Sequence, residues 1–277
     1  MTPELQIKVN RAVKLLQVTA GDDVVEVSYS GGKDSDVILE LTRMSGIKYR
    51  AIYKNTTIDP PGTIKHCIEN GVEVMKPKMT FIRLVKKKGM PTRRARFCCE
   101  ILKEYKVLDK SVQGIRRSES MARSKRYSED DSVICRLYGS KKNHVNVILP
   151  ILSWNDKEVA EFIAERNIKC HPLYYDEDGR FHPERRLGCI GCPMKSNAGR
   201  EDYKVYPKLF VQIVKAVVDW WKSHPNSSSV KKFGTPYGMV AHNLFYHSYN
   251  EWKNDDVNLF GRTDWKTFLE VQFKVEL

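Results

Sequence analysis

The sequence predicts an α/β fold, a twisted parallel sheet with helices on both faces, followed by a smaller and mainly helical C-terminal region. From residue 23 to about 170, short apolar runs alternate with amphipathic stretches, which is the pattern of repeated βα units. The first apolar run passes through a glycine turn directly into a helical pattern. Beyond Cys192 the alternation ends, and the final segment is rich in aromatic residues without a clear period.

The spacing of apolar residues predicts the elements in order. The first helix is N-terminal, with one apolar face made by Leu5, Val9, Ala12, Val13 and Leu16. Strands are expected over 24–30, 49–53, 72–75, 111–115 and 145–149. Further helices are expected over 34–44, after 60–61, and over 80–88, 97–106, 156 onward and 209–221. The chain should therefore comprise an N-terminal helix over 1–22, an α/β domain over 23–195 and a helical, aromatic region over 196–277.

Local signals set several boundaries. Gly89 should stop the helix over 80–88, and Asn155 should cap the helix that follows it. The composition of 224–229 is typical of a linker. Aromatic residues near the C-terminus are expected in the core rather than as base-stacking surfaces. These residues are Trp220, Trp221, Tyr237, Phe245, Tyr246 and Trp252.

The chain is basic, with 47 Lys and Arg against 34 Asp and Glu, a net charge of +13 and a pI near 9.3. A surface of this charge favours polyanions, either nucleotide phosphates or a nucleic acid backbone. A simpler alternative is good solubility together with a small anionic substrate. No apolar stretch is long enough to span a membrane, and the N-terminus lacks the features of a signal peptide. We therefore expect a cytoplasmic protein without a membrane partner.

The segment SGGKDS at residues 30–35 predicts a phosphate-binding loop between a strand and a helix. Its glycines allow close backbone approach, and the helix N-terminus that follows offers unpaired N–H groups to an anion. Lys33 adds a positive charge, while Asp34 can cap the helix or hold Mg²⁺ beside the phosphates. The spacing is not that of a Walker loop, and a turn that only connects strand to helix is the alternative. The candidate binding residues are Ser30, Gly31, Gly32, Lys33, Asp34 and Ser35.

Seven cysteines, an odd number, favour metal or redox chemistry over a disulfide framework. Two pairs are conspicuous, the adjacent Cys98 and Cys99 and the CxxC pair Cys189 and Cys192. A CxxC spacing lets two thiolates reach one metal, and a second pair completes four ligands. The remaining cysteines, Cys67, Cys135 and Cys170, have no such pattern, and Cys67 and Cys170 are most simply structural.

The loop resembles that of the PP-loop enzymes, the adenine nucleotide α-hydrolase superfamily, and within it the phosphoadenosine phosphosulfate (PAPS) reductase family. The resemblance extends from about Val24 to Lys195. It implies an adenine nucleotide α-hydrolase-like fold that binds ATP or a nucleotide of the adenylyl sulfate type, with Lys33 and Asp34 as catalytic residues. It also implies a second nucleotide-contacting turn and a pair of arginines on the anionic end of the nucleotide. These residues are Thr56, Thr57, Asp59, Arg116 and Arg117.

The cysteine pattern resembles that of the cluster-bearing branch of this family, in which adjacent cysteines and a distant CxxC hold a [4Fe–4S] cluster. The resemblance implies that Lys103 helps to couple the cluster to the nucleotide site. A structural zinc is the alternative interpretation of the same four ligands. The expected metal ligands are Cys98, Cys99, Cys189 and Cys192.

The sequence departs from the family at one position that matters for chemistry. Reductases of this family attack the sulfonucleotide with a cysteine near the C-terminus, whereas no cysteine follows Cys192 here. We therefore favour ATP-dependent sulfur transfer to an acceptor such as nucleic acid, in which a cluster-bound sulfur displaces AMP from an adenylated acceptor. The alternatives are a sulfonucleotide reductase that uses Cys135, Cys67 or a partner's cysteine, and a non-catalytic nucleotide- or nucleic-acid-binding subunit with structural zinc.

The expected partners follow from these functions. They are an adenine nucleotide with Mg²⁺ if it is ATP, a nucleic acid acceptor, and a protein that donates sulfur or electrons. The region over 196–277 can serve as a dimerisation element, which would give a homo-oligomer, or as a substrate platform.

Overall fold

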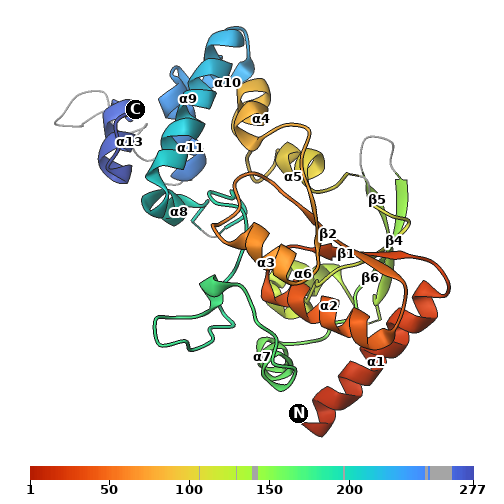
Figure 1. Ribbon diagram of the computed structural model, residues 1–277. Helices are drawn as coiled ribbons and strands as arrows, with labels where there is room; N and C mark the ends of the chain where they lie inside the picture. Colours follow the sequence, from red (N-terminus) through yellow and green to blue (C-terminus); the bar gives the residue numbers. More distant parts are fainter. Residues whose placement is uncertain (106, 129, 139–142, 196, 247–248, 250–263) are drawn as a thin grey trace. The chain divides into compact units, whose positions relative to one another are not determined.

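The computed structural model describes residues 1–277 except 106, 129, 139–142, 196, 247–248 and 250–263 (Figure 1). Contacts between residues divide the chain into two compact units. The first comprises 1–55, 59–77 and 100–188, and the second comprises 56–58, 78–99 and 189–277. The N-terminal helix thus belongs to the first unit, and the C-terminal region shares the second unit with two segments from the middle of the chain.

A six-stranded sheet with strand order β3-β2-β1-β4-β6-β5 forms the first unit. Every pairing is parallel except that of β5 with β6. The strands are β1 Val25–Tyr29, β2 Tyr49–Lys54, β3 Glu73–Met75, β4 Lys110–Val112, β5 Val133–Tyr138 and β6 Asn143–Ile148. The sheet confirms the predicted α/β class, because parallel neighbours require the crossover connections that the alternating pattern indicated.

Both faces of this sheet carry an apolar core, as Ile148 and its neighbour Val147 on β6 illustrate. Ile148 faces the larger cluster, to which α1 and α2 contribute Leu5 and Leu41, and Val147 faces a smaller cluster with Tyr127. Helix α1 packs against α2, and α2 packs against β1 and α7 (Figure 1). The helices of this unit are α1 Pro3–Ala20, α2 Lys33–Ser45, α3 Thr63–Glu69, α6 Met121–Arg126 and α7 Asp156–Glu165, with single 3-10 turns at Arg117–Glu119 and Pro172–Tyr174.

Two differences from the expected elements have local causes. Strand β5 was not predicted; it is an edge strand, paired only with β6, and it exposes Val133 and Leu137 on one face while Ile134 and Tyr138 on the other are only partly buried. Helix α5, Phe97–Leu102, ends before the expected residue 106, so Lys103 lies in the turn after the helix. The prediction that Lys103 continues the helix of Cys99 is therefore wrong.

The second unit is helical, as expected for the C-terminal region. Its helices are α4 Phe81–Lys88, α8 Arg200–Val205, α9 Pro207–Ser223, α10 Ser228–Phe233, α11 Pro236–Leu244 and α13 Trp265–Phe273. Its core includes a cluster of aromatic rings, in which Phe210 of α9 contacts Tyr203 and Phe273 in tilted orientations at centroid distances of 5.1 Å and 4.2 Å. The expected linker is shorter than predicted, because Ser227 caps α10 and ends the loop.

The expectation that the C-terminal aromatics are core residues holds for some of them. Trp220 is buried, whereas Tyr246 is 56% exposed, and Trp252 lies outside the described residues. No helix that the structure describes combines the length and the apolar character needed to cross a bilayer.

Candidate functional site

The predicted phosphate loop joins β1 to α2 at the carboxyl end of the sheet. Gly31 adopts a left-handed φ of 78°, and a Cβ there would come within 3.1 Å of Thr63 and 3.2 Å of Leu187. Helix α2 then begins at Lys33, and its N-cap residue Gly32 has no side chain that could cap it. The first turn of α2 therefore presents the positive end of the helix dipole to an anion.

A cavity of about 200 Å³ lies at this helix N-terminus. Lys33, Arg123 and Arg186 give it positive charge, and Asp34 and Glu119 also line it. It is smaller than the roughly 300–1,000 Å³ of pockets that enclose whole ligands. The cavity therefore fits the anionic end of a nucleotide rather than the entire molecule.

An ion-pair network fixes the charged residues of the loop. Lys33 Nζ lies 3.3 Å from Asp34 Oδ2, and Arg116 Nε lies 2.7 Å from Asp34 Oδ1. Arg116 also pairs with Asp156 at 2.8 Å and is only 1% exposed. Burial by itself would lower the pKa of Arg116, but the two carboxylates raise it above its ordinary value, so the guanidinium stays charged.

This network engages the guanidinium of Arg116 inside the protein, and its predicted contact with nucleotide remains a prediction. Its guanidinium also donates to Ser118 at 3.0 Å, so three of its nitrogens are engaged inside the protein. Arg116 does not line the described cavity, whereas Arg123 and Arg186 do, and both pair with Glu119. The geometry suits Arg116 to positioning Asp34 and the loop, and suits Arg123 and Arg186 to contacting an anion.

Tyr174 ties a distant segment to the phosphate loop. Its buried hydroxyl accepts hydrogen bonds from the backbone N–H of Lys33 at 3.2 Å and of Leu187 at 3.3 Å. Burial raises the pKa of Tyr174 to about 12, so the hydroxyl keeps its proton at neutral pH. Because Tyr174 also lines the cavity, this proton can be donated to a bound anion.

Replacement of Tyr174 by Phe tests this assignment. The variant keeps the buried ring but leaves two backbone N–H groups without their acceptor, so it should lose about 1–3 kcal/mol of unfolding free energy. We also expect weaker binding of inorganic pyrophosphate. Urea unfolding and calorimetric titration measure the two effects; unchanged stability and unchanged affinity would contradict the role of the hydroxyl.

Behind the loop, Asp36 of α2 forms a buried polar cluster with Tyr29 and His66. The Tyr29 hydroxyl bonds to Asp36, and His66 Nε2 lies 3.0 Å from the same carboxylate and 2.9 Å from the Tyr29 hydroxyl. Burial raises the pKa of Asp36. This cluster links β1, α2 and α3 and so supports the loop from the core side.

The expected second nucleotide-contacting turn falls on the boundary of the units. Asp59 lies in the first unit and accepts a hydrogen bond from the Tyr53 hydroxyl at 2.5 Å. Thr56 and Thr57 lie in the second unit, where Thr57 Oγ1 accepts from the Phe81 N–H at 2.9 Å. Their predicted contact with nucleotide remains a prediction.

The second unit contains all four predicted metal ligands. The pKa of Cys98 is raised, first by its hydrogen bond with Cys99, then by burial and by the neighbouring Cys99, Cys189 and Cys192. Each of the four thiols is half-buried, and none forms a disulfide. Two pairs separated by about ninety residues in the sequence are thus neighbours in the fold.

Polar contacts hold the CxxC loop in shape. Asp202 accepts hydrogen bonds from the Gly191 N–H at 2.7 Å and from Lys195 Nζ at 2.6 Å. Arg93 donates to the carbonyls of Pro193 at 2.9 Å and Lys195 at 2.6 Å. Because Arg93 precedes the first cysteine pair, these bonds connect the segments that carry the two pairs.

Gly191 is required by this packing. Its φ is 68°, and a Cβ would come 2.0 Å from the buried hydroxyl of Tyr203. Gly191→Ala should cost about 1–2 kcal/mol for the left-handed backbone and about 1–3 kcal/mol more for the steric overlap, and should reduce metal content. Gly179→Ala is the matched control, since Gly179 has a φ of 78° but no atom within 4 Å of an added Cβ. Equal losses in urea unfolding would contradict the packing argument.

A family model for the phosphoadenosine phosphosulfate reductase domain matches residues 25–195. The chain belongs to this family. Membership confirms the resemblance that the SGGKDS loop indicated and places the chain among the PP-loop enzymes. A search of curated protein sequences finds no match.

Three solved structures match the chain at low sequence identity. The FMN adenylyltransferase of Candida glabrata is 15% identical, with a TM-score of 0.43 and coverage of 68% of this chain and 62% of that chain. A PAPS reductase of Candida auris in a phosphate complex is 16% identical, with a TM-score of 0.44 and coverage of 68% and 96%. The U34-tRNA thiolase of Methanococcus maripaludis with its [4Fe–4S] cluster is 15% identical, with a TM-score of 0.41 and coverage of 94% and 84%. The chain spans less than two thirds of the first of these proteins.

The four predicted metal ligands are all thiols that form no disulfide. Four thiols near one another have the donor chemistry that a [4Fe–4S] cluster takes, and Arg96 donates a hydrogen bond to Cys99 Sγ at 3.5 Å, which would stabilise a thiolate. Among the residues that the structure describes, no three His, Cys, Asp or Glu side chains converge in a group that could hold a metal ion. The chemistry of the donors fits the cluster, while cluster binding itself remains a proposal.

Sequence reasoning did not identify Tyr174, Glu119 or Asp156 as parts of the phosphate site. Tyr174 lies 141 residues beyond Lys33, and Asp156 lies 40 residues beyond Arg116. Two of them had a usable signal: Glu119 follows the predicted Arg117 by two residues, and Asp156 follows the predicted cap Asn155 at the start of α7.

Proposed function

We propose that this PAPS-reductase-family enzyme activates an acceptor with ATP at the phosphate loop and then replaces an acceptor oxygen by sulfur. The observation that carries the proposal is the small cationic cavity at the N-terminus of α2, with Lys33 and Tyr174 in its wall. A cavity of this size and charge suits a pyrophosphate leaving group. The four neighbouring cysteines of the second unit support sulfur chemistry.

In the first step, an acceptor oxygen attacks the α-phosphorus of ATP. The bond from that phosphorus to the bridging oxygen breaks, and pyrophosphate leaves with the electron pair. Lys33, the Tyr174 hydroxyl and the N-terminus of α2 would stabilise the developing charge, because they are fixed before the reaction and are shielded from water. Arg123 and Arg186 would bind the outer oxygens of the leaving group.

In the second step, sulfide attacks the activated carbon of the acceptor, and AMP leaves with the former acceptor oxygen. When bound, a [4Fe–4S] cluster would supply a site for inorganic sulfide. The residues that would hold it are Cys98, Cys99, Cys189 and Cys192.

Asp34 is the residue that the sequence suggested for Mg²⁺. Its two carboxylate oxygens lie against Arg116 and Lys33, which is a poor arrangement for a cation. We therefore assign no step to a metal ion at Asp34.

A sulfonucleotide reductase is the second candidate, and one observation favours it. Cys135 is exposed on β5, with its sulfur 3.4 Å from His144 Nδ1, and a neighbouring imidazole can activate a thiol. Cys67 is less suitable than Cys135, because burial raises the pKa of its thiol to about 12. Burial also raises the pKa of Cys170, which suits a structural role.

The two candidates and the non-catalytic alternative differ in their products. Protein purified without oxygen should release pyrophosphate from ATP when an acceptor nucleic acid is supplied, and should not release sulfite from adenylyl sulfate with a thiol donor. Sulfite formation that Cys135→Ser abolishes would establish the reductase instead. If neither pyrophosphate nor sulfite is released and the protein holds one zinc ion, a non-catalytic binding subunit is favoured.

A further inference from the structure

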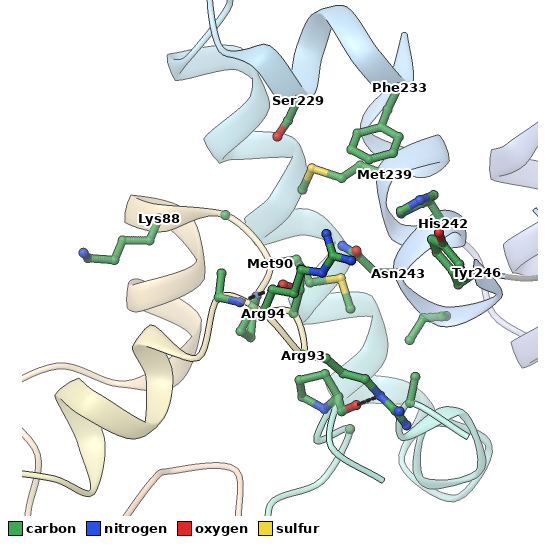
Figure 2. Close-up of a pocket in the computed structure, with 18 of the residues that line it drawn as sticks. Lys88, Met90, Arg93, Arg94, Ser229, Phe233, Met239, His242, Asn243 and Tyr246 are labelled. Atoms are coloured by element: carbon green, nitrogen blue, oxygen red, sulfur yellow. Dashed lines mark hydrogen bonds between the residues drawn. The ribbon is translucent and has the colours of Figure 1, made fainter. Parts of the chain in front are cut away.

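A second and larger cavity, of about 1040 Å³, lies entirely within the second unit. We call it the basic–aromatic pocket. Its walls come from α4, the 89–95 loop, the CxxC loop, α9, α10 and α11 (Figure 2). None of the functions assigned above uses this pocket.

The lining is strongly cationic. Among the described residues it includes no Asp or Glu, and its cations are Lys87, Lys88, Arg93, Arg94, Arg200 and Lys232. Arg93 is held by two carbonyls of the CxxC loop, and Arg200 lies over the Phe245 ring at 4.8 Å. Lys87, Lys88, Arg94 and Lys232 form no ion pair with any residue that the structure describes. Cations gathered without carboxylates around a hollow create a potential that attracts a polyanion.

Flat rings share the pocket with these cations. Phe233 and His242 lie 4.8 Å apart, and Tyr246 meets His242 edge-to-face at 5.1 Å. Figure 2 shows these three side chains on one side of the pocket, with Arg94 reaching from the loop towards Asn243. Trp220 is different: His224 stacks on it at 5.1 Å and Gly89 packs against it, so this ring serves the core.

We propose that the basic–aromatic pocket binds an unpaired nucleic acid strand, with a base against Tyr246 and the flanking phosphates on Arg94, Lys232 and the lysines of α4. Aromatic rings beside cations are the combination that binds single strands, because every base offers a face for stacking and every linkage a negative charge. The volume lies at the upper limit of small-ligand pockets, and the cations exceed what one nucleotide needs.

The basic–aromatic pocket adjoins the CxxC loop. Gly191 and Pro193, on either side of Cys192, belong to its wall. A strand bound there would bring an acceptor base next to the cysteine loop. The role of this strand as sulfur acceptor rests on the proposed function, whereas the binding of a strand to the pocket does not.

The test measures binding of a fluorescein-labelled single strand of about twelve nucleotides, as RNA and as DNA, by anisotropy with the full chain. We expect single strands to bind at least about tenfold more tightly than duplex of the same length. Affinity should fall with salt by a slope of about −0.7 for each phosphate contacted. The RNA and DNA arms show which sugar the pocket accepts.

Two variant pairs locate the site. The double variant Arg94→Ala/Lys232→Ala should lower the affinity for the single strand about tenfold or more and reduce the salt slope. The control variant Lys14→Ala/Lys169→Ala removes the same charge from exposed positions of the first unit and should have little effect on affinity. Tyr246→Ala should weaken binding about tenfold, and Tyr246→Phe should restore it because the ring is retained.

The outcomes separate this inference from the proposed function. Absent strand binding, equal affinity for duplex, or equal losses in the two double variants would overturn the pocket assignment. Pyrophosphate release from ATP, measured on the same samples, reports on the phosphate loop independently. Strand binding without pyrophosphate release would support the pocket as a strand-binding site and refute the proposed reaction.

Discussion

Lys33→Ala should lower the rate of pyrophosphate release from ATP by about 10²–10³-fold. Lys33 is 4% exposed and lies at the first position of α2, where its charge is shielded from water and adds to the helix dipole. The removed charge cannot be replaced by Arg116, whose guanidinium is held by Asp34 and Asp156. A stopped assay for pyrophosphate across ATP concentrations measures the loss and separates binding from turnover.

The control for this variant is Lys157→Ala, which removes an exposed lysine from α7 of the same unit and should leave the rate unchanged. Metal content should be the same in both variants, because the cysteines belong to the second unit. If turnover survives in Lys33→Ala, the loop is not the nucleotide site.

Cys189→Ser should reduce bound metal by about 10- to 100-fold or more. Cys189 is one of four neighbouring thiols, and a hydroxyl is a poor ligand for a soft metal site. Metal analysis and the visible spectrum of protein purified without oxygen provide the measurement. Iron with sulfide and a broad absorbance that bleaches on reduction would identify a cluster, whereas zinc without colour would identify the structural alternative.

Cys135→Ser is the matched control for the metal site, since it removes an exposed thiol outside the second unit. It should retain the metal of the parent protein. Full metal content in Cys189→Ser would show that the four cysteines do not form the site. Pyrophosphate release should persist in Cys189→Ser, because the residues proposed for that step lie in the first unit.

Much of the architecture was predictable because it depends on local spacing. The β1–loop–α2 segment was predicted from an apolar run, two glycines and a helical period, and the structure places β1 at Val25–Tyr29 and α2 at Lys33–Ser45. The cap Asn155 and the stop Gly89 were also predicted, since each depends on the backbone of its own helix end. Strand β5 was not, because its only partner is β6 and its two faces are both partly exposed.

The sequence alone therefore determined the α/β class and the PP-loop segment, because each is encoded in neighbouring residues, and it supplied the cysteine pattern from which a metal site is proposed. The tertiary structure decided which distant groups share a site. It set Arg116 against Asp34 and Asp156, joined Tyr174 to the amide of Lys33, and gathered four cysteines in one unit. It also placed the cations of α4 and α10 around the basic–aromatic pocket. Such contacts depend on how whole elements pack, and no short stretch of sequence specifies that packing.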